Sequence, residues 1–139
     1  MATKCSNLFL YQLLKNIEGH TFKICLMASG FVFNEDTHHG WADVSASELA
    51  NGNGYATGGQ TLASVAAAVD DVNNKGKLTA ADVSWTASGG SIGPTPGAII
   101  FDDTDTGDLI VGYCDFGANK TVTDGNPLQV TNIECKLES

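Results

Sequence analysis

Residues 98–116 read AIIFDDTDTGDLIVGYCDF, two apolar runs separated by a short polar segment. Runs of four to eight residues rich in Ile, Val, Phe and Tyr and bounded by turn formers are typical of β-strands. The segment between them, from Asp102 to Asp108, is rich in Asp, Thr and Gly, which favour turns. We therefore predict a β-hairpin with strands at 98–101 and 109–116.

The β pattern extends to the flanking segments. Within residues 21–28, Phe22, Ile24 and Leu26 alternate with a second set of side chains, which predicts a strand with distinct faces. Further strands are predicted at 60–69, 77–87 (with a bulge at 80–81) and 128–133, with a hairpin connection at 70–76 and irregular loops at 30–44 and 88–97.

Two short helical segments are also predicted. Residues 6–17 place four apolar side chains at helical spacing: Leu10, Leu13, Leu14 and Ile17. This segment is expected to form a short amphipathic helix, or an arm that docks on a neighbouring subunit. Ser45 and Glu48 have the spacing of a capping box, which predicts a helical turn after Ser45.

Short strands separated by glycine-rich turns, without helices between them, favour an all-β fold over a parallel α/β fold. The chain has 139 residues, sixteen of them glycine, and this length suits one domain. We expect a single domain over 1–139, in which a helix or arm at 1–19 precedes a jelly-roll-like antiparallel β-sandwich at 20–139.

The charge of the chain narrows the classes of partner. Sixteen acidic residues against seven lysines, with no arginine, give a net charge of −9. Nucleic acid is not expected as a partner, because affinity for it depends on cations that displace counterions from phosphates. An anionic membrane surface is disfavoured for the same reason, whereas a basic protein surface would be attracted.

Cysteine usage and hydropathy bear on the compartment. The four cysteines, at positions 5, 25, 114 and 135, include no C-x-x-C pair of the kind found at zinc and redox sites. We recognise no signal-peptide pattern and no apolar run of about 20 residues, so we expect cytosolic synthesis, reduced thiols and no membrane span. Cys25 and Cys114 lie in apolar strands and are expected to be inert core thiols.

One cluster is a candidate metal site: Asp36, His38, His39 and Asp43. Imidazole and carboxylate groups close in sequence can share a divalent ion. Adjacent histidines on an extended segment point to opposite sides, however, so a solvated loop is the preferred interpretation.

The acidic turn between the hairpin strands does not match a calcium loop. An EF-hand loop needs glycine at its sixth position and glutamate at its twelfth. Counting from Asp102, Gly107 fits, but Tyr113 stands where the glutamate belongs. We expect an exposed acidic hairpin tip, which would meet a basic partner or discourage edge-to-edge aggregation.

No catalytic, cofactor-binding or metal residue is predicted, and we expect that the protein is not an enzyme. No G-x-S-x-G signature occurs, and the glycine-rich stretch at 51–59 lacks the ending of a phosphate loop. A small metal-dependent enzyme on a cupin-like roll, using His38 and His39, is the remaining enzymatic alternative.

Among the aromatic residues, Trp85, Phe101 and Phe116 are assigned to the core. Trp41 and Tyr55 are left open, as parts of a carbohydrate or partner platform.

Several segments, taken in order, resemble one family. They are TFKICLMA (21–28), ELANGNGYATGGQTL (48–62), LTAADVSWT (78–86), GAIIFDD (97–103) and LIVGYCDFG (109–117). Their series is similar to that of small virion proteins of tailed bacteriophages, with the head cement, or decoration, proteins as the nearest members. The likeness covers residues 20–131 and leaves the N-terminal helix outside it.

The resemblance implies a jelly-roll subunit, made in the host cytoplasm, that sits as a homodimer on the outer surface of an HK97-like head and clamps adjacent major capsid protein subunits together. It carries no catalytic residue across. A carbohydrate-binding or tail-attached adhesion module of a phage is the alternative.

The residues themselves suggest where a partner would bind. We expect the partner surface at the helix and the acidic turn, with the candidate residues Leu10, Leu13, Leu14, Ile17, Asp102, Asp103, Asp105 and Asp108.

Overall fold

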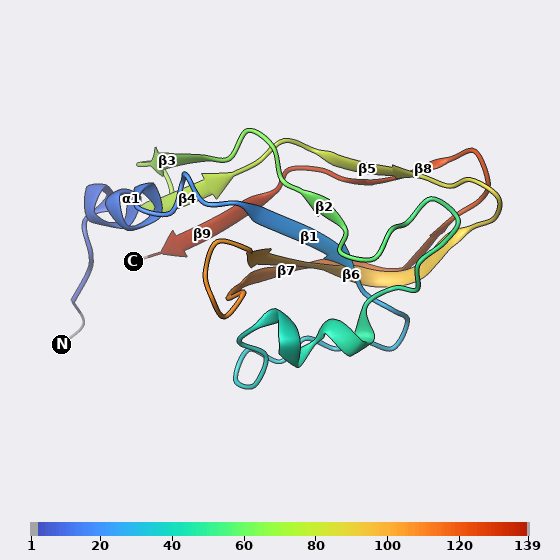
Figure 1. Ribbon diagram of the computed structural model, residues 1–139. Coiled ribbons are helices and arrows are strands. Elements are labelled where there is room, and N and C mark those ends of the chain that lie inside the picture. Colours follow the sequence, from blue (N-terminus) through green and yellow to red (C-terminus); the bar gives the residue numbers. More distant parts are fainter. Residues whose placement is uncertain (1–2, 139) are drawn as a thin grey trace.

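The computed structural model describes residues 3–138 and is built mainly of antiparallel strands. In chain order the elements are α1 (Asn7–Lys15), β1 (Phe22–Leu26), the 3-10 helices η1 (Trp41–Asp43) and η2 (Ser45–Ser47), β2 (Gln60–Thr61), β3 (Ala66–Asp70), β4 (Lys75–Thr79), β5 (Val83–Thr86), β6 (Ile92–Asp102), β7 (Ile110–Val122), β8 (Pro127–Val130) and β9 (Glu134–Glu138). Figure 1 shows α1, β3, β4 and β9 at one end of the molecule and β5 and β8 toward the other. The prediction of an all-β sandwich with a short N-terminal helix is confirmed.

Strand β6 lies inside a four-stranded sheet of order β2-β1-β6-β7. All pairings in this sheet are antiparallel, and Ile99 of β6 lies opposite Cys25 of β1 on one side and Tyr113 of β7 on the other. The hairpin predicted at 98–116 is confirmed, because β6 and β7 pair along this stretch.

Two smaller sheets, β3-β4-β9 and β5-β8, form the second layer of the sandwich. β4 leads into β5 and β8 leads into β9, while β4 pairs with β9 and β5 with β8, so the two sheets are successive parts of one interrupted ladder. The interruption falls at 80–82 and 131–133. The strand predicted at 77–87 is therefore two strands, and its break includes the residues where a bulge was expected.

Two segment predictions in the middle of the chain need correction. The strand predicted at 60–69 is divided into β2 and β3, and Ser64 between them has a positive φ of 55°, which interrupts extended backbone. More than half of the loop predicted at 88–97 is strand, because β6 begins at Ile92. Its glycines and prolines suggested a loop, but β6 pairs with β7 there through register shifts that accommodate them.

The C-terminal prediction is also incomplete. The strand expected at 128–133 ends at Val130, and a further strand, β9, follows it. β9 was missed because it carries only two apolar side chains, Cys135 and Leu137, between charged neighbours. Its half-buried and exposed residues alternate, as expected of a strand with one face toward solvent.

The main core lies between the two layers. Strand β1 turns Phe22, Ile24 and Leu26 toward it, which is the face that the alternation predicted. The second layer contributes buried side chains that include Leu78, Val83, Trp85, Leu128, Val130 and Ile133. Hydrophobic residues from strands far apart in sequence are thus buried together, which is the main source of stability in such a sandwich.

The opposite face of the four-stranded sheet is buried as well. Cys25, Met27, Ile99 and Phe101 on this face form a second cluster, against which the loop expected at 30–44 packs its own aromatic and aliphatic side chains. Figure 1 shows this loop, with η1 and η2, lying below the sheet. The loop is therefore a covering layer as well as a surface segment.

Helix α1 packs on its own chain. Ser6 caps it by accepting a hydrogen bond from the backbone N–H of Phe9 at 3.2 Å, and Leu10 and Leu14 are buried against β3 and β4. Gly76 of β4 permits this close approach, because a Cβ there would lie 2.8 Å from the backbone of Leu10. Within residues 3–138 no helix is long and apolar enough to cross a membrane.

A partly buried hydrogen-bond network joins the loop region to the sheet. The Tyr55 hydroxyl donates to Glu48 Oε1 at 2.7 Å and accepts from the backbone N–H of Leu26 at 3.1 Å, and Glu48 Oε1 also accepts from the Gly58 N–H at 2.7 Å. Tyr55 is thus a core residue. The capping box predicted at Ser45 is wrong, because the Glu48 carboxylate is engaged by Tyr55 and Gly58 and the turn is a short 3-10 helix.

The contact between α1 and β4 gives a testable prediction. Replacing Gly76→Ala forces the new Cβ against the backbone of Leu10 and Tyr11, so the free energy of unfolding, measured with urea, should fall by about 1–3 kcal/mol. Gly112→Ala on β7 is the matched control, since a Cβ there meets nothing within 4 Å. The control should be neutral or stabilising by up to about 1 kcal/mol, and equal losses in the two variants would contradict the close approach.

Candidate functional site

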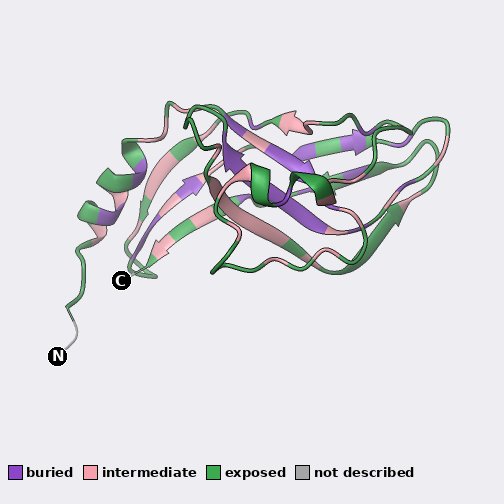
Figure 2. Cartoon of the chain, turned by 60° about the horizontal axis from the view of Figure 1, so that its bottom comes forward, coloured by how far each residue is buried: buried purple, intermediate pink, exposed green. Residues whose placement is uncertain are grey.

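Strand β7 stands at the end of the four-stranded sheet and pairs with β6 on one side only. It is thirteen residues long and begins with the apolar run Ile-Val-Gly-Tyr-Cys at 110–114, every residue of which is partly exposed. Figure 2 shows buried residues in the middle of the sheet and intermediate and exposed residues along this outer strand. Long apolar edge strands are usually shortened, charged or covered, because their unpaired backbone groups attract other strands.

The loop covers only the beginning of this edge. Gly40 forms an antiparallel bridge with Leu109, while the Ile110 N–H donates to the His39 carbonyl at 2.7 Å and the Trp41 N–H donates to the Asp108 carbonyl at 3.0 Å. From residue 111 onward, no strand within 3–138 pairs with β7 on that side. We call residues 111–117 the bare edge.

Three grooves surround the bare edge. The loop-side groove, of about 1060 Å³, lies between β7 and the loop at 30–39. The β8-side groove, of about 540 Å³, lies between β7 and β8, and the helix-side groove, of about 490 Å³, lies between β7, α1 and β9. Every residue from Leu109 to Gly117 lines at least one of them, so this part of β7 is accessible from both faces of the sheet.

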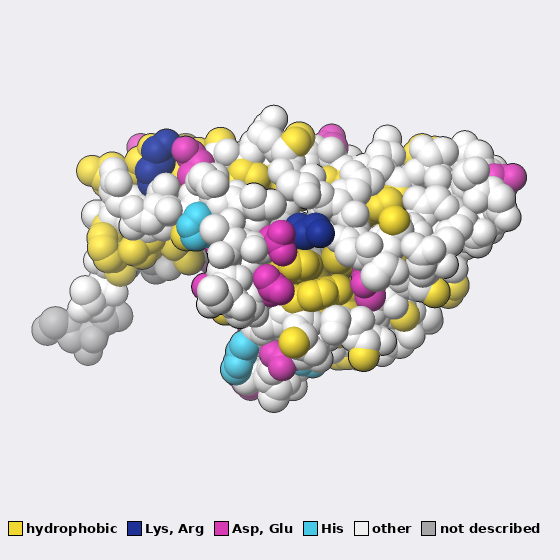
Figure 3. Space-filling model, in the orientation of Figure 1, with side chains coloured by type: hydrophobic (Ala, Val, Ile, Leu, Met, Phe, Trp, Pro, Cys, Tyr) yellow, Lys and Arg dark blue, Asp and Glu magenta, His cyan; other side chains and the backbone are white. Residues whose placement is uncertain are grey.

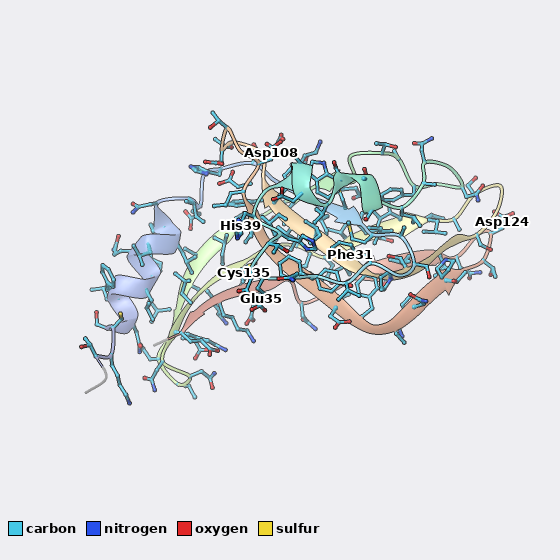
Figure 4. All side chains as sticks on the ribbon, turned by 90° about the horizontal axis from the view of Figure 1, so that it is seen from below. Phe31, Glu35, His39, Asp108, Asp124 and Cys135 are labelled. Carbon is cyan, nitrogen blue, oxygen red and sulfur yellow. The ribbon has the colours of Figure 1, made fainter. Side chains whose placement is uncertain are left out.

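Aromatic rings form the floor of the loop-side groove. The ring of Tyr113 stacks on Phe33 at 5.6 Å between centroids and meets Phe31 edge-on at the same distance, and Phe31 stacks on His38 at 5.7 Å. Figure 4 looks at this side of the molecule and labels Phe31, His39 and Glu35 beside β7. The rings hold the loop against the strand and leave an apolar surface facing the groove.

Carboxylates supply the formal charge in this groove. Glu35 and Asp115 line it, together with His38 and His39, and none of its described lining residues is a lysine. Asp115 Oδ1 accepts a hydrogen bond from the Gly117 N–H at 2.8 Å, which fixes this carboxylate on the strand. The groove is therefore apolar in its floor and acidic at its rim.

Two members of the candidate metal cluster, Asp43 and His38, take part in hydrogen bonds within the loop. The Gly40 and His39 N–H groups donate to Asp43 at 2.9 and 3.0 Å and lower the pKa of its carboxyl. His38 Nδ1 accepts from the Asn34 N–H at 3.1 Å. Among residues 3–138 no three His, Cys, Asp or Glu side chains are grouped so as to hold an ion. That the protein is not an enzyme stays a prediction.

The acidic turn is only partly the exposed tip that the sequence suggested. Asp103, Asp105 and Asp108 lie outside the core, but Asp102 is 6% exposed and its Oδ2 lies 2.6 Å from His20 Nδ1. Asp102 also accepts from the Thr104 N–H at 3.0 Å. Asp102 therefore ties the start of β1 to the hairpin and is corrected from a partner-binding residue to a structural one.

The helix candidates divide in the same way. Leu10 and Leu14 are buried against the chain's own strands and are unavailable to a partner, which corrects that part of the prediction. Leu13 is 43% exposed and, like Ile17, lines the helix-side groove. The interface role of Leu13, Ile17, Asp103, Asp105 and Asp108 stays a prediction.

The assignments of the aromatic residues are mostly correct. Trp85 and Phe101 are buried, whereas Phe116 is only partly buried against the main core. Trp41, which was left open, stacks on Phe101 at 4.9 Å and belongs to the second cluster. Sequence reasoning missed Phe31 and Phe33, although their spacing in Phe-Val-Phe, with both aromatics on one face of an extended segment, was a usable signal.

Three of the four thiols are weak nucleophiles because they are buried or partly buried. Burial raises the pKa of Cys25 to about 12 and that of Cys114 to about 11, and it also raises the pKa of Cys135. Cys25 is a core thiol, as predicted, but Cys114 is only partly buried and lines two of the grooves. The thiolate is the reactive form, so both thiols are poorly reactive at neutral pH.

The arrangement as a whole suits the binding of an extended chain, because it combines unpaired strand backbone with grooves on both faces of the strand. No protein-family model, curated protein or solved structure matches this chain. The geometry of the bare edge is therefore the structural ground on which a function can be proposed.

The raised thiol pKa values predict a pH profile for alkylation. At pH 8 a thiol with a pKa near 11 is about 0.1% thiolate, so iodoacetamide should modify Cys114 slowly in the native protein, and the rate should rise about tenfold per pH unit until the pH approaches that pKa. Cys25 should react only after unfolding. Mass spectrometry of each peptide measures both rates. Labelling of native Cys114 at pH 7 as fast as in the urea-unfolded chain would contradict the prediction.

Proposed function

We propose that the chain is a structural virion protein, a cement or decoration protein that binds the outer surface of an HK97-like phage head and stabilises contacts between major capsid protein subunits. The observation that carries this proposal is the bare edge of β7, a long, apolar and accessible strand edge. A monomer that worked alone would be expected to protect such an edge.

The resemblance to phage virion proteins supports the proposal in the same part of the chain, the sheet that carries the bare edge. The segments that resemble phage virion proteins include those that form β1, β6 and β7. These strands belong to the four-stranded sheet, and β7 among them carries the bare edge. The likeness therefore lies in the part of the chain that carries the candidate binding surface.

Self-association is part of the proposal, and helix α1 offers a surface for it. Leu8, Phe9 and Leu13 are 62%, 54% and 43% exposed, and Figure 3 shows hydrophobic side chains gathered at the end of the molecule where α1 lies. A homodimer that touches two capsid subunits gains avidity from the effective concentration of its second site. Binding that favours the assembled lattice over separate subunits then stabilises the shell.

Virions offer the direct test. Imaging should place many copies on the outer head surface, and heads that lack the protein should release their DNA at a lower temperature than decorated heads. Occupancy should also fall as sodium chloride is raised toward about 1 M, where the Debye length is about 3 Å. Equal heat resistance of heads with and without the protein would contradict the stabilising role.

A second candidate is a carbohydrate-binding or tail-attached adhesion module. The loop-side groove favours it, because Phe31, Phe33 and Tyr113 offer ring faces next to the polar groups of Asp115 and Asn119. Pockets with an apolar floor and a few polar groups are common ligand sites. A glycan array should give a signal that Phe33→Ala removes, and absence of any signal would reject this candidate.

A further inference from the structure

We propose that the bare edge of β7 binds an extended, lysine- or arginine-bearing segment of the partner protein, which joins the four-stranded sheet as an added antiparallel or parallel strand. That the partner is a capsid protein rests on the proposed function. The inference adds which surface binds the partner and what chemistry the bound segment has. It rests on three features of residues 109–117: the existing pairing at one end, the grooves on both faces, and the charge of the loop-side groove.

The chain already adds a short segment to this edge. Residues 39–41 pair with 108–110 through the bridge between Gly40 and Leu109 and the two hydrogen bonds beside it. In a β-ladder, alternate residues present N–H and C=O groups to each side, so the strand beyond Ile110 has further groups available on the same side. A partner strand would continue the line that residues 39–41 begin, over about 17 Å for five residues at about 3.4 Å each.

The grooves predict the side-chain pattern of the added strand. Successive side chains of a strand point to opposite faces. One set would enter the loop-side groove and the other would enter the helix-side groove, where Leu13, Ile17 and Leu137 are apolar. The structure therefore favours a partner segment in which basic and apolar residues alternate.

The negative charge of the loop-side groove favours basic side chains in the added strand. Glu35 and Asp115 flank the loop-side groove, and the rings of Phe33 and Tyr113 lie between the loop and the strand. A lysine or arginine there can pair with a carboxylate and lie against an aromatic face, both of which are favourable. The net charge of −9 adds a general attraction for a basic segment.

The same charges disfavour a second copy of this chain at the edge. Residues 110–116 of β7 read IVGYCDF and bring no cation, so a symmetric pairing would fill neither loop-side groove with a basic residue. It would also add the carboxylate of a second Asp115 to each edge. A self-associating surface is therefore placed elsewhere, at the exposed side chains of α1.

The probe is a blocked nine-residue peptide in which lysine alternates with valine and threonine, carrying a fluorophore for anisotropy measurements. We expect it to bind the purified protein and to weaken as salt is raised from about 0.05 M to about 0.5 M. The same peptide with glutamate in place of lysine should not bind. Methylation of one alternate set of backbone amides should abolish binding and methylation of the other set should not, because only one set faces β7.

Matched variants locate the site. Glu35→Gln with Asp115→Asn should weaken peptide binding about tenfold, whereas Asp71→Asn with Glu138→Gln, which removes the same charge from exposed positions elsewhere, should not. Gly112→Lys places a cation on the bare edge and should abolish binding. Gly19→Lys is its control, because a Cβ at either glycine meets nothing within 4 Å.

Three outcomes would overturn the inference: equal binding of the lysine and glutamate peptides, peptide binding that survives Gly112→Lys, or a dimer in the ultracentrifuge that Gly112→Lys alone dissociates. Decoration of purified heads separates this inference from the proposed function. If the peptide binds but the wild-type protein does not decorate heads, the cement function fails and the edge inference stands. If heads are decorated equally by wild type and Gly112→Lys, the edge inference fails and the cement function stands.

Discussion

The structure depends on a central pair of strands, β1 and β6, whose side chains are buried on both faces. Ile24 and Leu26 of β1 point into one core, and Cys25 and Met27, next to them in sequence, point into the other; all four are 0% exposed. A sheet that is apolar on both faces must be covered twice, because each exposed face would cost hydrophobic free energy of roughly 25 cal/mol per Å². The ladder of β4, β5, β8 and β9 supplies one cover and the loop after β1 supplies the other.

The bare edge follows from the extent of these two covers. β1 and β6 lie beneath both, but β7 at the end of the sheet lies beneath only their margins, so its side chains are partly exposed on each face. The backbone pairing of the loop with this edge ends at Ile110, and farther along the strand the loop contacts β7 through side chains, such as Phe31 and Phe33 on Tyr113. The grooves on either side of β7 are therefore the spaces that remain where the two covering layers stop short of the sheet's last strand.

Much of this fold was accessible from local sequence patterns, and the remainder was not, for identifiable reasons. The hairpin at 98–116 was predicted from two apolar runs separated by a polar turn, and β1 was predicted from the alternation of Phe22, Ile24 and Leu26 with a second set of side chains. The division of 60–69 into β2 and β3 depends on the positive φ of Ser64. A serine side chain does not indicate such a backbone conformation, so the break could not be predicted. The burial of Asp102 depends on His20, 82 residues away, and no local rule links the two. The candidate edge was missed because strand order, not strand identity, decides which strand is left unpaired.

The acidic residues beside the apolar edge of β7 decide which strands can pair with that edge. A row of unpaired backbone groups attracts any strand, including those of identical molecules, and specificity then requires an element that repels the wrong partner. Asp115 on the strand and Glu35 on the loop provide that element, since a second copy meets them with carboxylates of its own and a basic segment meets them with opposite charge. The side chains that select a basic partner are thus also the ones that keep the bare edges of two identical molecules apart, and salt that weakens the selection should weaken the protection with it.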